Sequence, residues 1–169
     1  MNRILAIDPT PRGFGFALLE DRPLRLIDWG VVECRRGNKE ENRGKRLRGL
    51  FQEYDPSIFV IEDCGRKTSR RGHATRRFAD EIRLLAQRVH LPLKKFSREQ
   101  VKQAFALHGA TTKQQIAQVL ADGFPELKPR LPTVREIWQS EDYRISIFDA
   151  VALGMTFVAN EGSLESVGA

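Results

Sequence analysis

The sequence has few of the residues that build cross-linked or histidine-based metal sites, and it has no long apolar segment. Its 169 residues include only two cysteines, Cys34 and Cys64, and three histidines. The cysteines have no paired spacing, which excludes a disulfide scaffold and a cysteine-rich zinc site, and the scattered histidines argue against a histidine-based metal site. No window of about 18 apolar residues occurs, so the sequence contains no transmembrane helix.

The length and the N-terminus are typical of one globular domain. A chain of 169 residues is the size of a single domain, and it buries roughly 70% of its unfolded surface without needing a disulfide. The run from Arg3 to Asp8 is short and ends in an acid, whereas a signal peptide needs a longer apolar region and a small-residue cleavage site. We therefore expect a cytoplasmic protein without a membrane partner. Its domain is expected over residues 1–159, with a flexible tail over 160–169.

The charge is unbalanced toward lysine and arginine. Lys and Arg number 28 against 22 for Asp and Glu, which gives a net charge of +6 and a pI of about 9.7. Such an excess favours anionic partners, nucleic acid first, although many basic proteins bind no nucleic acid. The distribution of the charges is therefore more informative than their total.

Hydrophobic patterning predicts an α/β protein. Apolar runs bounded by turn residues predict five strands, over 3–8, 14–20, 24–34, 57–61 and 91–96. Helical spacing and the capping residues Ser97 and Thr111 predict helices over 38–54, 78–89, 97–107, 111–122 and 145–159, with an irregular segment over 123–135. The first three strands have short links, so we expect an antiparallel meander with the fourth strand beside the first. The expected fold class is α/β, a mixed five-stranded sheet flanked by helices.

Acidic residues end two of the apolar strands, and a third lies in an apolar helix. Asp8 ends the first strand, Glu62 ends the fourth, and Asp149 lies within the last helix. If the two strands are parallel neighbours, their acids emerge at the same edge of the sheet. Taken singly, Asp8 fits a turn residue, Glu62 a solvated one and Asp149 a partner for an arginine. Taken together, they favour a site for Mg²⁺ or Mn²⁺, because converging buried carboxylates need a hard cation to offset their repulsion.

These motifs resemble a known nuclease family. Ile7-Asp8-Pro9 with the glycines at 13 and 15, then Ile61-Glu62, then the segment 148–153 are similar to the three acidic motifs of RuvC-type Holliday junction resolvases, of the ribonuclease H-like superfamily. The segment 98–103, followed by Gly109 and Lys113, resembles the helix pair of that family. The resemblance extends over about residues 2–158.

The resemblance implies an activity and a role for each site residue. It implies a ribonuclease H-like fold and a crossover junction endodeoxyribonuclease that cleaves Holliday junctions in recombination and repair. Two Mg²⁺ or Mn²⁺ ions per active site would promote attack of water on a DNA phosphate. Asp8 would bridge the ions, while Glu62 and Asp149 would each complete one coordination shell. Lys113 would neutralise charge on the phosphate and Lys102 would position the strand, although their spacing alone favours a solvated helix face.

The resemblance also implies how the protein assembles on branched DNA. Resolution of a four-way junction needs two symmetric cuts, and resolvases of this family are homodimers with two active sites. Their interface involves the helix after the glutamate strand, here 74–89, where Phe78, Ile82, Leu85 and Val89 are available for the interface or for the monomer core. The expected partner is four-way junction DNA, and no small-molecule substrate is expected.

Three positions depart from the family pattern. Where the family has a fourth metal ligand, this chain has Ser146, and Asp142 lies one turn further back, on the same helical face as Ser146 and Asp149. We therefore take Asp142 or Ser146 as the candidate for the fourth position, with a helix N-cap as the alternative for Asp142. Thr10 replaces the glycine that commonly follows the Asp-Pro pair, and the loop after Glu62 lacks an aromatic residue.

Basic residues gather beside the expected metal site. The segment 66–77 holds six Lys or Arg residues and no acid, and a second cluster lies at 94–102. A further basic cluster over 35–48 fits a solvated helix face better. Phosphate contacts of this kind provide affinity without reading base sequence. The residues expected to contact DNA are Arg66, Lys67, Arg70, Arg71, Arg76, Arg77, Lys94, Lys95 and Arg98.

Two other function classes compete with a junction-cleaving nuclease. One is a catalytically weakened RuvC-like protein that binds branched DNA without efficient cleavage, which the serine at 146 supports. The retained Asp8, Glu62 and Asp149 argue against it, because buried acids are costly to keep without a use. The other is a sugar-kinase or actin-like nucleotide binder, whose two-domain cleft needs more than 169 residues.

Overall fold

The computed structural model describes residues 2–34, 37–65, 71–134, 136 and 138–167. Its strands are β1 (Arg3–Thr10), β2 (Gly13–Asp21), β3 (Leu24–Glu33), β4 (Ile58–Glu62) and β5 (Leu93–Phe96). Its helices are α1 (Lys39–Tyr54), α2 (His73–Arg88), α3 (Arg98–Ala106), α4 (Lys113–Gly123), the short 3₁₀ helix η1 (Pro125–Arg130) and α5 (Ile145–Val167). None of the helices in these ranges is long and apolar enough to cross a membrane.

The strands form one mixed sheet in the order β3-β2-β1-β4-β5. β1, β2 and β3 are antiparallel neighbours, whereas β4 runs parallel to β1 and β5 runs parallel to β4. The predicted meander and the place of the fourth strand beside the first are therefore confirmed. Because β1 and β4 are parallel and adjacent, their carboxyl ends meet at the same edge of the sheet.

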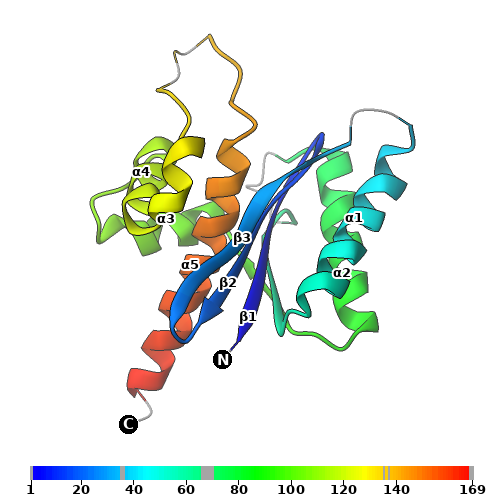
Figure 1. The fold of residues 1–169 in the computed structure, drawn as a ribbon, viewed down its shortest axis with the longest axis horizontal. Coiled ribbons are helices and arrows are strands. Elements are labelled where there is room, and N and C mark those ends of the chain that lie inside the picture. The colour runs from blue at the N-terminus through cyan, green and yellow to red at the C-terminus, as the bar shows by residue number, and fades with distance from the viewer. Residues whose placement is uncertain (1, 35–36, 66–70, 135, 137, 168–169) are drawn as a thin grey trace.

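Helices cover both faces of the sheet. α1 and α2 lie on one side, and α3, α4 and α5 lie on the other (Figure 1). Alternate residues of β1 enter different cores: Leu5 and Ile7 pack toward α1 and α2, whereas Ile4 and Ala6 pack toward α5. Burial on both faces explains why β1 and β4 are continuous apolar runs rather than alternating ones.

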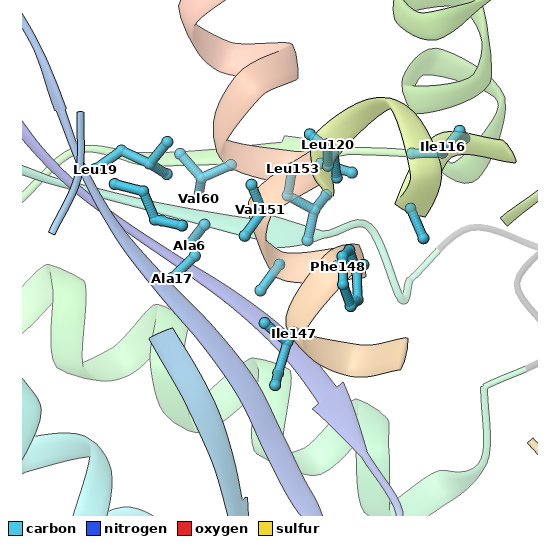
Figure 2. Close-up of a cluster of buried hydrophobic side chains, with 14 of the residues drawn as sticks. Ala6, Ala17, Leu19, Val60, Ile116, Leu120, Ile147, Phe148, Val151 and Leu153 are labelled. Carbon is cyan, nitrogen blue, oxygen red and sulfur yellow. The ribbon is translucent and has the colours of Figure 1, made fainter. Parts of the chain in front are cut away.

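The core on the α5 side is built around that helix. Phe148, Val151 and Leu153 of α5 pack against Ala6 and Val60 of the central strands (Figure 2). Helix and sheet approach closely at Gly154, where the lack of a side chain leaves room for Leu19. A Cβ atom added there would lie only 2.4 Å from Leu19 Cδ1. A second close approach, between Gly15 opposite Asp8 and Ser146 in the first turn of α5, places the start of the helix over the edge where β1 ends.

Local signals located the starts of α3 and α4 to within two residues, whereas α2 begins at His73, before the predicted residue 78, and the last helix ends later than predicted. Ser97 and Gln100 form the predicted capping box, in which Ser97 N donates to Gln100 Oε1 at 2.8 Å. The next N-cap is Thr112, not Thr111 as predicted, and it also forms a capping box. α5 was predicted to end near residue 159 but continues to Val167, since the segment contains no proline to stop it. The flexibility expected over 160–169 stays a prediction, and residues 168–169 lie outside the described ranges.

Candidate active site

Three acids from three elements line one cavity. Asp8 comes from β1, Glu62 from the last position of β4 and Asp149 from α5, and they border a cavity of about 270 Å³. Strand alternation explains the convergence: Asp8 follows Ala6 by two residues and Glu62 follows Val60 by two, so both acids point to the face that α5 covers. Asp8 is 2% exposed and Glu62 8%. The fold therefore places together the acids that the sequence singled out.

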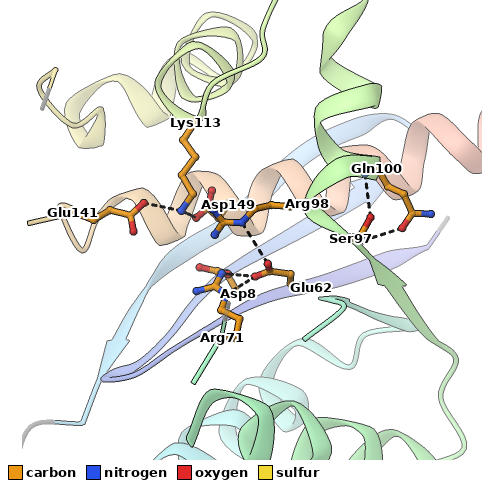
Figure 3. A network of polar contacts seen from close by, with 9 residues as sticks. All are labelled: Asp8, Glu62, Arg71, Ser97, Arg98, Gln100, Lys113, Glu141 and Asp149. Carbon is orange, nitrogen blue, oxygen red and sulfur yellow. Dashed lines mark hydrogen bonds and ion pairs between the residues drawn. The ribbon is translucent and has the colours of Figure 1, made fainter. Parts of the chain in front are cut away.

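An arginine joins two of these acids. Arg71 Nη2 lies 2.7 Å from Asp8 Oδ1, and Arg71 Nε donates to Glu62 Oε2 at 2.8 Å, with a second bond from Nη2 to the same oxygen (Figure 3). Arg98 Nε lies 3.5 Å from the other Glu62 oxygen, Oε1. Both arginines were expected to contact DNA. In the structure both pair with acids of the site, because a buried carboxylate pair attracts the nearest cations, and their contact with DNA stays a prediction.

Lys113 holds the third acid. It is the first residue of α4, and its Nζ lies 2.8 Å from Asp149 Oδ2 and 2.6 Å from Glu141 Oε1 (Figure 3). Sequence reasoning did not identify Glu141. A signal that could have found it is its place next to Asp142, since the two are adjacent acids shortly before the last helix.

Neither candidate for a fourth ligand bonds to the three acids. The helix begins at Ile145, so Asp142 does not share its face with Asp149, and that expectation is wrong. Asp142 Oδ2 pairs with Arg144 Nη2 at 2.6 Å, and the hydrogen bonds from Arg144 lower the pKa of this carboxyl. Ser146 is buried and donates its hydroxyl to Tyr143 O at 2.8 Å. Both side chains nevertheless border an adjoining cavity of about 230 Å³ that Asp8 and Asp149 also line. Their roles as ligands stay predictions.

The acids and bases of the site perturb one another. Burial raises the pKa of Asp8 well above its ordinary value, repulsion from Asp149 raises it further, and the attraction of Arg71 opposes both. For Lys113, burial lowers the pKa, but the charge of Asp149 and the hydrogen bonds to Asp149 and Glu141 outweigh burial and leave the pKa raised. The ionised form of Asp8 is therefore unfavourable here, mainly because burial removes its hydration, and a cation bound to it would offset that cost.

The side chains that line the cavity are of the chemical type that binds hard divalent cations. Mg²⁺ and Mn²⁺ prefer carboxylate oxygens, and three carboxylates line the cavity, one of them almost fully buried. Within the described residues, however, no three His, Cys, Asp or Glu side chains lie close enough together to hold a metal ion. The charged groups of Arg71 and Lys113 instead contact the carboxylates.

The other basic residues predicted for DNA contact lie in different settings. Lys102 is exposed and lines the cavity of the acids, and Arg76 is exposed in the first turn of α2. Arg77 Nη2 pairs with Glu40 at 3.0 Å. Lys94 and Lys95 are exposed on the edge strand β5, where lysine also discourages pairing with other strands. Arg66, Lys67 and Arg70 lie outside the described residues.

Known proteins resemble this chain in sequence. The family model described as crossover junction endodeoxyribonuclease RuvC matches residues 4–128. The protein of that name from Trichlorobacter lovleyi is 30% identical over 138 residues, which cover 74% of this chain and 75% of the relative. The one from Roseiflexus is 28% identical over 140 residues, covering 78% of this chain and 80% of the relative.

Solved structures share the fold. The structure of T. thermophilus RuvC in complex with a Holliday junction substrate has a TM-score of 0.67 at 19% identity and covers 96% of this chain and 97% of that one. The yeast mitochondrial Holliday junction resolvase has a TM-score of 0.68 at 13% identity and covers 98% of this chain and 81% of that one. The predicted ribonuclease H-like fold, a mixed five-stranded sheet flanked by helices, is thereby confirmed.

Proposed function

This chain belongs to the crossover junction endodeoxyribonuclease RuvC family, and we propose that it cleaves Holliday junctions in DNA recombination and repair. The observation that carries the proposal is the cavity that Asp8, Glu62 and Asp149 share at the end of two parallel strands. The alternative, a weakened protein that binds branched DNA without turnover, is not favoured, because the relatives are named as nucleases and the costly buried acids are retained.

RuvC-family nucleases depend on metal ions, and we propose that two Mg²⁺ or Mn²⁺ ions serve this site. Asp8, Glu62 and Asp149 would hold them, and the bound ions would supply an activated water and charge stabilisation on the leaving oxygen. The remaining chemistry belongs to the chain. Lys113, at the cavity wall, would offset negative charge that develops on the phosphate. Lys102, exposed at the same cavity, would position the strand that is cut.

We propose that exposed basic residues around the cavity bind the junction. Lys94 and Lys95 on β5 and Arg76 on α2 are exposed at the surface. Contacts of this kind would bind duplex arms whatever their sequence, as recognition by junction shape requires. The cytoplasmic location expected from the sequence stays a prediction.

We further propose a homodimer, because two symmetric cuts need two active sites. Of the α2 residues named for the interface or the core, Phe78 and Ile82 are fully buried in the core of this chain and cannot form the interface. Leu84, on the same helix, is 44% exposed and borders a groove with α1. Sedimentation equilibrium of the wild type and of Leu84→Glu tests the assignment: we expect a dimer that the charge dissociates, and a wild-type monomer would contradict it.

The central experiment uses synthetic four-way junctions with Mg²⁺ or Mn²⁺. Wild type is compared with Asp8→Asn, which keeps the shape of the side chain and removes its charge, and with the control Asp122→Asn at an exposed position of α4. We expect Asp8→Asn to bind the junction without cutting it and Asp122→Asn to cut like wild type. Wild-type binding without cleavage in either metal would instead support the alternative of a non-cleaving junction binder.

A further inference from the structure

Arg71 occupies the place between the two acids that end β1 and β4. Its guanidinium binds Asp8 Oδ1 at 2.7 Å and Glu62 Oε2 at 2.8 Å, so one group contacts both carboxylates (Figure 3). The side chain is only 18% exposed. An arginine that served only to bind DNA would be exposed to solvent, whereas the side chain of Arg71 is mostly buried against the two carboxylates.

Cations already contact the acids of the site. Asp8, Glu62, Asp149 and Glu141 face three cations, namely Arg71, Arg98 and Lys113. Each of these acids is therefore contacted by at least one cation among the described residues. A divalent cation added beside Arg71 would raise the charge of the site by two, whereas one that replaces Arg71 would raise it by only one.

Arg71 and a metal ion also need the same atoms. A hard cation binds carboxylate oxygens at about 2.1 Å, and a guanidinium on the same oxygens repels it at close range. Arg71 lies between β4 and α2, outside both elements, so its side chain can leave the acids without disturbing a strand or a helix.

We propose that Arg71 is a built-in competitor of the metal ion at the Asp8–Glu62 pair. It balances these acids while the site is free of metal and gives up its bonds to them when a cation binds. The displaced guanidinium then lies at the cavity, where it can donate hydrogen bonds to a phosphate of the DNA. This inference rests on the proposed metal dependence. Its consequence is that metal affinity is weaker than the three carboxylates alone would produce.

The test measures Mn²⁺ binding by calorimetry on the whole protein without DNA. Arg71→Gln removes the charge, and we expect it to bind Mn²⁺ about ten-fold more tightly than wild type, equivalent to about 1.4 kcal/mol. The matched control is Arg83→Gln, which removes an equal charge from an arginine that pairs with Asp80 on α2 and does not line the cavity of the acids. The control should bind like wild type.

A second variant covers a failure of Arg71→Gln to fold. Arg71→Lys keeps the charge but lacks the fork that holds two carboxylates at once, so we expect an affinity between those of wild type and Arg71→Gln. Thermal melting is an independent readout, because added Mn²⁺ should raise the melting temperature more in the Arg71 variants than in wild type.

The outcomes separate this inference from the proposed function. If wild type binds Mn²⁺ and neither Arg71 variant binds more tightly, the competition is refuted while metal dependence stands. Weaker binding in both Arg71 variants also refutes it, because Arg71 would then support the metal site. If no variant and no wild-type protein binds Mn²⁺ at all, the metal dependence itself fails.

Discussion

Gly15 controls how closely β2 approaches the helix that carries Asp149. It pairs with Asp8 across the β1–β2 ladder. A Cβ atom added at Gly15 would lie 2.2 Å from the carbonyl oxygen of Ser146, in the first turn of α5. Ordinary contacts of a Cβ atom begin at 3.4 Å, so Gly15→Ala must push the strand and the helix apart by about 1 Å. Backbone atoms cannot rotate away as a flexible side chain would.

The expected effect has a structural part and a catalytic part. Overpacking of this kind lowers the free energy of unfolding by about 1–3 kcal/mol. A displacement of about 1 Å at a reacting centre costs on the order of 100-fold in rate, so we expect cleavage at saturating Mg²⁺ to fall by that factor. The spacing between Asp149 and the pair formed by Asp8 and Glu62 is what changes.

Urea unfolding and single-turnover cleavage of a synthetic junction measure the two parts. The matched control is Gly49→Ala on α1, where an added Cβ meets no atom within 4 Å and should stabilise the helix by about 0.5–1 kcal/mol without affecting cleavage. If Gly15→Ala matches Gly49→Ala in both assays, the close approach of β2 and α5 is not what positions Asp149, and the reasoning is wrong.

Three further predictions concern charges of the site. Glu141→Gln removes one of the two carboxylates that pair with Lys113, so Lys113 should bind Asp149 more strongly and compete better with the metal. Because the lost ion pair is half-exposed, we expect the Mg²⁺ concentration for half-maximal cleavage to rise by up to about five-fold. Glu126→Gln is the control that should cleave like wild type, and an unchanged Mg²⁺ titration for Glu141→Gln would contradict the prediction. Ser146→Asp adds a carboxylate beside Asp149 and should lower the Mg²⁺ requirement, whereas Ser146→Ala should not; equal titrations for the two would show that position 146 does not serve the metal. The raised pKa of Asp8 means that its contribution to stability is fully present below the ordinary value of 3.8 and is lost as pH rises through the folded-state pKa. Asp8→Asn should therefore raise the melting temperature of the metal-free protein more at pH 8 than at pH 4, and an equal gain at both would refute the shift.

Strand signals in the sequence were sufficient to locate the acids. Each central strand is an apolar run ending in a carboxylate, and the period of two along a strand places Asp8 on the face of Ala6 and Glu62 on the face of Val60. Local chemistry also marked the start of α3, because the bonds of a capping box join residues only three apart. These features depend on near neighbours along the chain, which is why they could be predicted.

Only the tertiary structure decided which charges neutralise these acids. Arg71 reaches Asp8 across 63 positions of the chain, and Lys113 reaches Asp149 across 36. The sequence therefore did not show that Arg71 pairs with the acids, and it placed Asp142 on the face of a helix that in fact begins at Ile145. Pairing of long side chains depends on where loops bring their ends, and no periodicity in the sequence records that. The sequence thus places a basic segment soon after Glu62 in the chain, while the fold decides that Arg71 and Lys113 make the contacts with the acids.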